Sequence, residues 1–391
     1  MRDLLKIKFD TKRAYGLDIL RAGAILSVIA AHGAKITPQR TWSFQNDVFP
    51  DGVFLFFVLS GYLIGGILIK ILENNKATPK NLGNFWVRRW FRTIPAYFLI
   101  LTVLIIMRNL FNGGLPAGTG IYRYYLFIQN FHTPHPIFYS EVWTLSIEEW
   151  FYLLVPATIF LLVGVFKLKP KRAIISTAVA IIIASIAFRL YRYSMHPPTS
   201  IAEWDSYYRK EVVTRLDSLM FGLVGAYFTY YHKPLWIRHK VVLFWAGLAL
   251  IITQQAVGDF IGSGQHINQS GFGLYLSVFS FTVMALGTLL LLPLLSEISS
   301  GKGFVYKALT YVSITSYSMY LIHVSLIQPF VYDVTNVPVT HLLMAVRYVM
   351  YWVLTIIGSI LLYKYFEKPS TGLREKLVRK QYKSAPPEPP R

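Results

Sequence analysis

The stretch GLDILRAGAILSVIAAHGAKI (residues 16–36) is an apolar run that carries two ionisable side chains, Arg21 and His32. A helix needs roughly 20 mostly apolar residues to cross a hydrocarbon core of about 30 Å, and this run has that length. An ionisable side chain within a span costs about 3 kcal/mol or more, so it is expected to face the interior of a helical bundle. His32 follows Arg21 by about three helical turns, so both project from nearly the same face. Residues 16–36 therefore predict a membrane-spanning helix with a polar interior face.

The rest of the chain repeats this pattern of long apolar runs divided by short polar breaks. Only 15% of the 391 residues are charged, whereas soluble domains have about 25%. The predicted fold class is therefore all-α, a polytopic helical bundle of the membrane. Its ten predicted spans are residues 16–36, 51–72, 91–109, 143–166, 172–190, 211–231, 240–257, 272–295, 308–330 and 341–366. An aromatic stretch at 121–131 is too short to cross and is expected to be interfacial or re-entrant.

The distribution of Lys and Arg predicts the orientation of the chain. Of its 39 Lys and Arg residues, 28 fall in segments on the N-terminal side of the predicted membrane and 8 fall in loops on the opposite side. Because cytoplasmic loops carry the excess of Lys and Arg, we expect both termini in the cytoplasm. The same asymmetry accounts for the formal charge of +20, so no nucleic-acid partner is expected.

The predicted domain organisation is a single membrane domain with two short flanking segments. Residues 1–15 form a basic cytoplasmic segment, residues 16–368 the membrane domain, and residues 369–391 a Pro-rich cytoplasmic tail that is expected to be partly disordered. The chain has no cysteine, which excludes disulfides, thiol nucleophiles and Cys-based metal sites. We predict no metal site and no permanently bound cofactor.

Two adjacent carboxylates, Glu148 and Glu149, lie early in the predicted span 143–166. Acidic residues near a helix N-terminus interact favourably with its dipole, so one of them could serve as a cap. The two side chains point about 100° apart, and one can therefore face the bundle interior. Glu148 is expected at a depth similar to that of His32. A histidine with a carboxylate partner is the usual general-base pair, in which the acid orients the ring.

Basic and aromatic residues alternate in FWVRRWFR (residues 85–92), which leads into the third predicted span. These arginines either anchor the topology of the chain or hold the phosphates of a ligand whose base stacks on the neighbouring aromatics. Glycines in SGYLIGG (residues 60–66) either permit close helix approach or leave room for a narrow ligand chain. Arg215, His323 and Arg347 are predicted near the outer ends of their spans, where they suggest a polar cavity, although Arg347 could also extend to the interface.

Several of these motifs, in this order, resemble those of the acyltransferase-3 family of bacterial membrane O-acyltransferases. The similar segments are Gly16–Ala22 with His32, Asp51–Tyr62, Arg88–Arg92 with Ile94 and Pro95, Trp143–Tyr152, Arg215–Gly222, Ser316–His323 and Phe366–Pro369. The resemblance runs across nearly the whole chain, and within 143–152 it selects Glu148 over Glu149. The family often has an acidic residue where Phe54 stands here. Any role of that acid is therefore absent or filled elsewhere, for example by Asp51.

The resemblance implies a membrane O-acyltransferase of the bacterial cytoplasmic (inner) membrane. Such an enzyme moves an acyl group, often acetyl, from cytoplasmic acyl-CoA to a hydroxyl of an extracytoplasmic carbohydrate. The catalytic residues would be His32, as general base or acyl acceptor, and Glu148, which orients it. Acyl-CoA would contact Arg21, Arg88, Arg89, Arg92, Ser60, Gly61 and Tyr62. Oxyanion or acceptor contacts would come from Arg215, Asp217 and His323.

The rival hypothesis is a transporter or flippase for a glycan or a lipid-linked precursor, because intramembrane Arg and His also mark substrate pathways. Transporters often contain paired repeats or matching broken helices, and the sequence shows neither. A transporter also has no need of a phosphate-binding cluster on one side and a His–Glu pair on the other. A structural scaffold would have little reason to keep costly residues at one depth.

Overall fold

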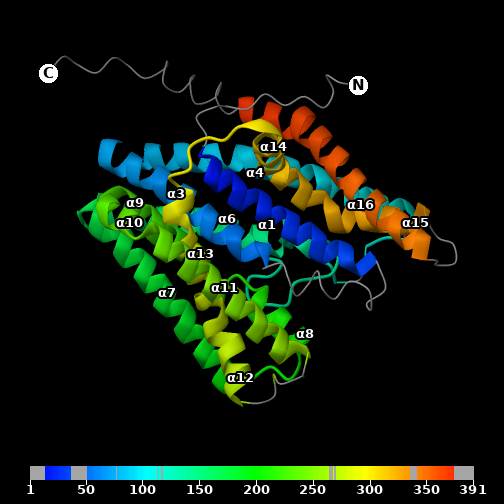
Figure 1. The fold of residues 1–391 in the computed structure, drawn as a ribbon, viewed down its shortest axis with the longest axis horizontal. Helices are drawn as coiled ribbons and strands as arrows, with labels where there is room; N and C mark the ends of the chain where they lie inside the picture. Colours follow the sequence, from blue (N-terminus) through cyan, green and yellow to red (C-terminus); the bar gives the residue numbers. More distant parts are fainter. Residues whose placement is uncertain are drawn as a thin grey trace.

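A computed structural model describes residues 14–36, 51–75, 77–111, 113–115, 118–263, 267, 270–334 and 341–373. Every regular element in these ranges is a helix, which confirms the all-α fold class (Figure 1). The longest helices are α1 (Tyr15–Gly33), α3 (Gly52–Asn75), α4 (Pro79–Phe111), α6 (Trp143–Gly164), α7 (Pro170–Met195), α9 (Leu216–Tyr231), α11 (Lys240–Ser263), α13 (Ser280–Leu295), α14 (Gly303–Ile322) and α16 (His341–Leu362).

Short helical segments connect these long helices. They are η1 (Ala34–Ile36), α5 (Ile121–Tyr125), η2 (Ser140–Val142), α8 (Ile201–Trp204), η3 (Asp205–Arg209), α10 (Lys233–Arg238), α12 (Ser270–Leu274), η5 (Tyr275–Phe279), η6 (His323–Ile327), α15 (Gln328–Val334) and η7 (Tyr363–Glu367). Four of them, η3, η5, η6 and η7, are π-turns. Such turns are rare and occur frequently at functional sites.

Eight segments of the described chain are long and apolar enough to cross a membrane. They are Tyr15–Gly33, Gly52–Asn74, Pro79–Phe111, Ser140–Gly164, Pro170–Met195, Lys240–Ile261, Gly271–Leu295 and Leu343–Leu373. The remaining two predicted spans, 211–231 and 308–330, overlap α9 and α14. Helix α9 has only 16 residues because the chain turns before Leu216, and α14 gives way to a π-turn after Ile322. The count of ten and the cytoplasmic termini remain predictions, and most of segments 1–15 and 369–391 lies outside the described residues.

Helix α4 begins twelve residues before the predicted span 91–109, so its arginines lie on the helix rather than in front of it. Its 33 residues make it about 50 Å long, whereas the hydrocarbon core is about 30 Å thick. The first turns of α4 therefore extend beyond an apolar layer of that thickness. The short stretch predicted at 121–131 forms the five-residue helix α5 and a turn, and it does not span.

The tightest helix pair is α3 with α9, where two glycines face each other. A Cβ atom on Gly61 would lie 1.9 Å from Leu219 O, and one on Gly222 would lie 2.0 Å from Val58 O. Any larger side chain at either position would separate the backbones, which small residues allow to approach closely. This pairing fixes which face of α3 is left for the rest of the bundle.

Contacts between helix ends define two ends of the bundle. At one end, Gly16 N donates to Ile298 O at the start of α1, and Tyr231 OH, where α9 ends, donates to Glu73 of α3 at 2.5 Å. This end also carries the first turns of α4, and we call it the arginine end. At the opposite end, Gly52 packs against Ala24 and Val28 in the second half of α1. We call this second end, which carries His32, the histidine end.

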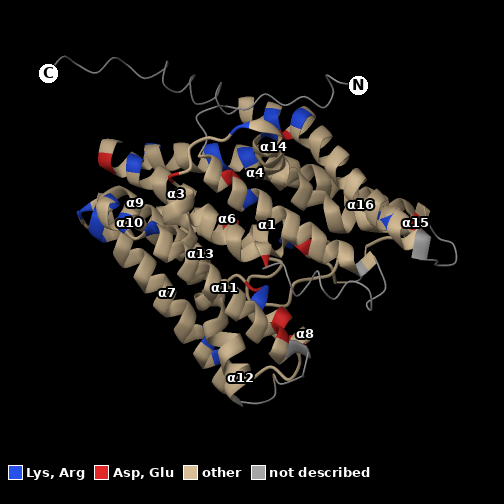
Figure 2. Cartoon of the chain, in the orientation of Figure 1, with Lys and Arg blue, Asp and Glu red and all other residues tan. Residues whose placement is uncertain are grey.

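Charged residues are sparse along the helices, although some, such as Arg189, Arg215 and Asp217, are buried within the bundle. Figure 2 shows long uncharged stretches of helix, with Lys and Arg gathered along the upper and left margins of the view, over the ends of α3 and α10 and the segment after α16. In Figure 1, α7, α11 and α13 run toward α8 and α12 in the lower part of the view. Buried side chains of α1, α3, α6, α7, α9 and α13 form most of one large hydrophobic core, and a second cluster forms where α4 packs against α5, the residues around the start of α6 and the end of α14.

Candidate functional site

A cavity of about 550 Å³ runs along α3 between α4, α6 and α14. Ligand cavities are typically about 300–1,000 Å³. Five cationic side chains line it, and the only carboxylate among the described lining residues is Glu148. The cationic side chains are Arg21, Lys70, Arg88, Arg89 and Arg92. Because Lys70, Arg88 and Arg92 are exposed, the cavity is accessible from the arginine end, and we call it the arginine-end cavity.

Glu148 is held inside this cavity by three neighbours. Ser60 Oγ donates to Glu148 Oε1 at 2.8 Å, Tyr152 OH donates to Oε2 at 3.0 Å, and Arg89 Nη2 lies 3.6 Å from Oε2. The Arg89 guanidinium also lies over the Tyr152 ring, 3.9 Å from its centroid, and donates to its hydroxyl. Glu148 therefore orders Arg89 and the cavity wall.

The neighbouring Glu149 points away from the cavity, toward α4. It is buried and accepts a hydrogen bond from Thr93 Oγ1 of α4 at 2.8 Å. Helix α6 begins at Trp143, and its first turn contains no acidic residue. Helix capping therefore does not explain either glutamate, and their divergent directions place Glu148 alone in the cavity.

The predicted donor contacts on α3 divide between its two faces. Ser60 lines the arginine-end cavity. Gly61 packs against α9 instead, and the Tyr62 hydroxyl lies 3.2 Å from Thr229 Oγ1 of that helix. The structure thus places these two on the opposite face of α3, because consecutive helical positions are about 100° apart. Close helix approach, rather than room for a ligand, accounts for Gly61.

The aromatic residues beside the arginines are occupied by contacts with the protein. Trp86 and Trp90 stack with ring centroids 6.1 Å apart, and Trp86 Nε1 donates to Tyr152 O at 3.0 Å. Phe85 is the aromatic of this segment that lines the cavity. Stacking of a ligand base on an aromatic residue of this segment stays a prediction, and Phe85 is the residue placed for it.

His32 lies at the end of α1 and pairs with His323, which begins the π-turn η6. His32 Nδ1 is 3.2 Å from His323 Nε2 and 2.9 Å from Val28 O, and the rings meet edge to face with centroids 5.0 Å apart. A carbonyl oxygen only accepts, so neutral His32 carries its proton on Nδ1 and its lone pair on Nε2. His323 Nδ1 lies 2.7 Å from Tyr320 O, which by the same logic leaves His323 Nε2 as an acceptor for His32.

This pairing differs from the predicted partnership of His32 with Glu148. Among the described residues no hydrogen bond or ion pair joins those two side chains, because Glu148 lies in the arginine-end cavity, of which His32 is not a lining residue. The partner that orients His32 comes from α14, not from α6. His323 was expected near the outer end of the bundle, and the structure brings it into direct contact with His32.

Glu141 is a residue whose importance the sequence did not reveal. It is buried in η2, just before α6, and accepts hydrogen bonds from the backbone N and the hydroxyl of Ser325. Ser325 lies within the π-turn η6, so Glu141 holds the turn that presents His323. A lone Glu ahead of the Trp143 motif gives no periodic signal, and only the fold connects it to η6.

Tyr320 and Thr144 stand between the arginine-end cavity and the histidine pair. Both line the cavity, and Thr144 Oγ1 donates to Tyr320 OH at 2.8 Å. The Tyr320 ring centroid lies 5.5 Å from that of His323, and its hydroxyl also donates to Glu141 O. These two side chains therefore close the inner end of the cavity.

The predicted oxyanion residues Arg215 and Asp217 lie elsewhere. Arg215 is completely buried, with its guanidinium 4.4 Å from the Phe54 ring centroid and 4.3 Å from that of Phe281. Its Nε and Nη2 have no hydrogen-bond partner among the described residues. Asp217 binds Arg189 at 2.7 Å. Both side chains are thus engaged beside α3, outside the lining of the arginine-end cavity.

Phe54, which replaces the acidic residue common in the resembling family, supplies an aromatic face to Arg215 in place of a carboxylate. Such cation–π contacts are worth about 2 kcal/mol when desolvated. Asp51, the suggested substitute, pairs with a different cation. Arg209 Nη2 lies 2.6 Å from Asp51 Oδ2, so Asp51 does not replace the missing acid at Arg215.

Arg347 is buried and lies over the Tyr332 ring, which does not fit extension to an interface.

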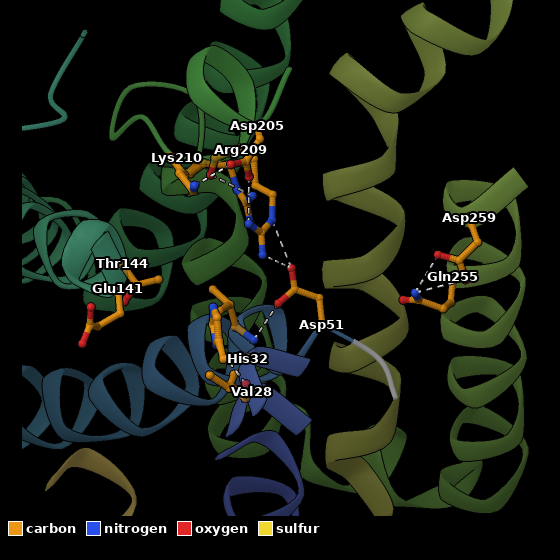
Figure 3. A network of polar contacts seen from close by, with 12 residues as sticks. Val28, His32, Asp51, Glu141, Thr144, Asp205, Arg209, Lys210, Gln255 and Asp259 are labelled. Carbon is orange, nitrogen blue, oxygen red and sulfur yellow. Dashed lines mark hydrogen bonds and ion pairs between the residues drawn. The ribbon is translucent and has the colours of Figure 1, made fainter. Parts of the chain in front are cut away.

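The Asp51–Arg209 pair belongs to a wider ionic group at the histidine end (Figure 3). Arg209 also binds Asp205 at 2.9 Å, and Lys210 contacts the same carboxylate. Burial alone would raise the pKa of Asp205, but Arg209 and Lys210 hold it below its ordinary value. The Arg209 guanidinium lies 5.1 Å from the Trp143 ring. Because Gly52 touches Val28, this group lies about one turn of α1 from His32.

Comparison with known proteins agrees with the resemblance read from the motifs. The profile of the family described as "Acyltransferase domain" matches residues 14–364. Peptidoglycan O-acetyltransferase OatA of Listeria monocytogenes is 28% identical over 339 residues, covering 82% of this chain and 50% of that protein. O-acetyltransferase OatA of Staphylococcus aureus is 26% identical over 383 residues, covering 90% of this chain and 56% of that protein. The chain thus spans about half the length of these curated relatives, and no solved structure gives a significant match.

Proposed function

Because the chain belongs to the acyltransferase-3 family and is a multi-pass bacterial membrane protein, we propose that it transfers an acetyl group from acetyl-CoA to a carbohydrate hydroxyl. The observation that supports this most directly is the separation of two kinds of chemistry. A cation-lined cavity is accessible from one end of the bundle, and a histidine pair lies near the other. The name of the Listeria monocytogenes relative, a peptidoglycan O-acetyltransferase, points to a cell-wall glycan as the acceptor.

The donor binds with its phosphates at the mouth of the arginine-end cavity. Arg88 and Arg92 are exposed there, and guanidinium groups bind phosphates through paired, charge-assisted hydrogen bonds. Arg89 is ordered by Glu148 and Tyr152 and contributes a fixed positive charge deeper in the cavity. The narrow arm that carries the thioester extends along α3 toward Thr144 and Tyr320. The basic end of the bundle faces the cytoplasm, where acetyl-CoA is available.

His32 is the general base. Its Nε2 lone pair takes the proton from the acceptor hydroxyl while that oxygen attacks the thioester carbonyl carbon. The new C–O bond forms, the C–S bond breaks, and the proton passes from His32 to the departing thiolate. The products are the acetyl ester and free CoA, and His32 returns to its neutral form.

His323 is a positioning residue for His32. Its Nε2 shares the His32 Nδ1–H with the Val28 carbonyl, and the two acceptors together fix the tautomer that leaves Nε2 of His32 basic. The same contact stabilises the positive charge that His32 acquires during transfer. Glu141 holds the turn on which His323 lies. This arrangement assigns to a second histidine the role that an aspartate has in many general-base systems.

Tyr320 separates donor and base in the conformation described. Its hydroxyl bonds join it to Thr144 and the Glu141 carbonyl, so a rotation of the Tyr320 side chain opens the cavity toward His32. Such a step would bring the thioester and His32 together only after the donor has bound. It would thereby limit hydrolysis of the thioester when no acceptor is present.

The direct test is acetyl transfer by the purified, reconstituted protein. Protein in lipid nanodiscs is given acetyl-CoA and isolated peptidoglycan strands, and release of the CoA thiol is followed with a thiol reagent. Because the chain has no cysteine, CoA is the only thiol that forms. The proposal requires stoichiometric thiol release and acetylated glycan in the mass spectrum. Glycan that crosses the bilayer without acetylation would instead establish a transporter.

A further inference from the structure

A second cavity, of about 620 Å³, lies at the histidine end of the bundle. Its walls are the start of α3, the α8–η3 segment, the C-terminal half of α11 and the region where η5 passes into α13. We call it the histidine-end cavity. Its volume falls within the usual range for small-molecule sites, about 300–1,000 Å³. Donor binding as proposed above makes no use of it, since the residues lining the two cavities do not overlap.

The charged residues that line this cavity are two carboxylates and one arginine. Asp51 and Arg209 form an ion pair on one wall, and on α11 Gln255 Nε2 donates to both carboxylate oxygens of Asp259, at 3.1 and 3.3 Å. Figure 3 shows Gln255 and Asp259 on one helix, apart from Asp51 and Arg209. A carboxylate accepts two or more hydrogen bonds, and an amide both donates and accepts. Such a lining suits a neutral ligand with several hydroxyl groups, whereas two carboxylates beside one cation disfavour an anion.

The remaining lining is aromatic and flat. Trp204 and Phe281 line the cavity and stack in parallel, with ring centroids 5.7 Å apart and planes inclined by 1°. Trp204 is only partly buried, although its Nε1 is fixed by Leu276 O at 3.2 Å. Pyranose rings have an apolar face of C–H bonds and a rim of hydroxyls. A cavity that combines a fixed aromatic surface with convergent carboxylate and amide groups matches both features.

The position of this cavity connects it to His32. Its residue Asp51 directly precedes Gly52, which packs against Val28, and the Val28 carbonyl is the one that His32 contacts. The arginine-end cavity lies along the same helix, with Val53 and Phe57 in its lining. Helix α3 therefore separates the two cavities, and the histidine pair lies near where they approach each other.

We propose that the histidine-end cavity is the acceptor subsite, which binds a neutral pyranose unit of the glycan and presents one hydroxyl toward His32. This inference rests on the proposed function, because it names where the second substrate binds. Trp204 supports the apolar face of the sugar, while Asp51, Arg209, Gln255 and Asp259 contact its hydroxyls. The substrate class is a neutral amino-sugar or hexose unit within a longer chain.

The test uses chitotetraose, a neutral N-acetylglucosamine oligomer, as the acceptor for the reconstituted full chain. The double variant Gln255→Ala, Asp259→Asn removes hydrogen-bonding groups from the exposed part of α11. We expect its KM for chitotetraose to rise about tenfold or more, with KM for acetyl-CoA within about twofold of wild type. Trp204→Leu provides an independent variant on the opposite wall, with the same expectation.

Two matched controls separate binding from loss of fold. Trp245→Leu removes an exposed tryptophan of the same helix α11, and Glu297→Gln removes a carboxylate at the arginine end. Both should leave the two KM values unchanged. An unchanged KM for chitotetraose in both cavity variants, with transfer intact, overturns the acceptor subsite but leaves the acetyltransferase proposal standing.

Direct binding distinguishes the two proposals further. Chitotetraose binding to the protein is measured by saturation-transfer NMR without any donor. If the wild-type protein binds chitotetraose and the cavity variants do not, while no thiol is released from acetyl-CoA, the acetyltransferase proposal fails and the glycan site stands. If the wild-type protein does not bind chitotetraose, or if the cavity variants bind it as well as the wild-type protein does, the glycan site is overturned. Either result is also expected if the cavity holds a lipid chain instead.

Discussion

The two cavities along α3 have similar sizes but opposite chemistry. The arginine-end cavity has five cationic side chains against one carboxylate, whereas the histidine-end cavity has one arginine against two carboxylates, together with a stacked aromatic pair. Helix α3 supplies residues to both, with Val53 lining one cavity and Phe54 the other. The contrast teaches that one helix can separate an anionic ligand from a neutral ligand, because its consecutive residues face different directions.

The largest effect is expected from removing His32, the general base that we place near the point where the two cavities approach each other. His32→Ala should lower kcat for acetyl transfer by about 10²–10⁴-fold, the usual contribution of general-base catalysis. The affinity for CoA should not change, because His32 does not line the arginine-end cavity. The matched control is His196→Ala, at the exposed end of α7. Wild-type turnover by well-folded His32→Ala would remove His32 from the mechanism.

His323→Ala tests whether the second histidine acts through the first. We expect a loss of about 10–100-fold in kcat, because the Nδ1 proton of His32 keeps the Val28 carbonyl but loses its second acceptor, which orients the ring and stabilises its charged form. His323→Gln supplies an amide oxygen in that place and should recover part of the activity. Equal loss in both variants, with reduced thermal stability, would indicate a purely structural role.

Glu148→Gln should instead weaken donor binding, since Glu148 orders Arg89.

Phosphate binding in the arginine-end cavity can be tested with dephospho-CoA, which lacks one phosphate of CoA. Arg88→Ala, Arg92→Ala should raise KM for acetyl-CoA about tenfold with little change in kcat, because each guanidinium contributes charge-assisted hydrogen bonds to phosphate. The affinities for CoA and dephospho-CoA should differ less in this variant than in wild type. The double variant Arg238→Ala, Lys240→Ala, at the end of α10 and the start of α11, is a control that also removes two positive charges. An unchanged affinity for CoA would return the two arginines to the role of topology anchors.

The smallest expected effect concerns the pH response of the histidine end. His135 lies in the loop before α6, with its Nε2 2.9 Å from Tyr139 O. Burial lowers the pKa of His135 to about 4, against the opposing effect of that hydrogen bond and with the help of Lys210. Since the unfolded chain takes up this proton near pH 6.5 and the folded chain does not, the stabilisation is complete above that pH and is lost as the pH falls toward 4.

The thermal midpoint should therefore drop by about 1–2 °C for each pH unit below 6.5, since one pH unit corresponds to about 1.4 kcal/mol and the unfolding entropy of a 391-residue chain is large. His135→Gln keeps a donor for the Tyr139 carbonyl but does not titrate, so it should flatten this part of the profile. The measurement is a pH series of melting curves in one detergent. Identical pH profiles for wild type and His135→Gln would show that other groups dominate the acid response.

The sequence alone determined the features that depend on composition and on helical periodicity. Long apolar runs identified the all-α membrane fold, and the spacing of Arg21 and His32 placed them on one face of one helix. The motif around residues 143–152 selected Glu148 over Glu149, and the structure places Glu148 in a cavity with Arg88, Arg89 and Arg92. These features are local or statistical, so they can be read without knowing which helices are neighbours.

Only the tertiary structure decided which side chains meet. His323 follows His32 by 291 positions, and no periodicity within a helix can identify a partner on another helix. For the same reason the sequence assigned Gly61 and Tyr62 to the donor path, although packing against α9 turns both away. The histidine-end cavity joins residues of four separate segments. Side-chain direction along one helix follows from its geometry, but the contacts across helices follow from packing, which the order of residues does not reveal.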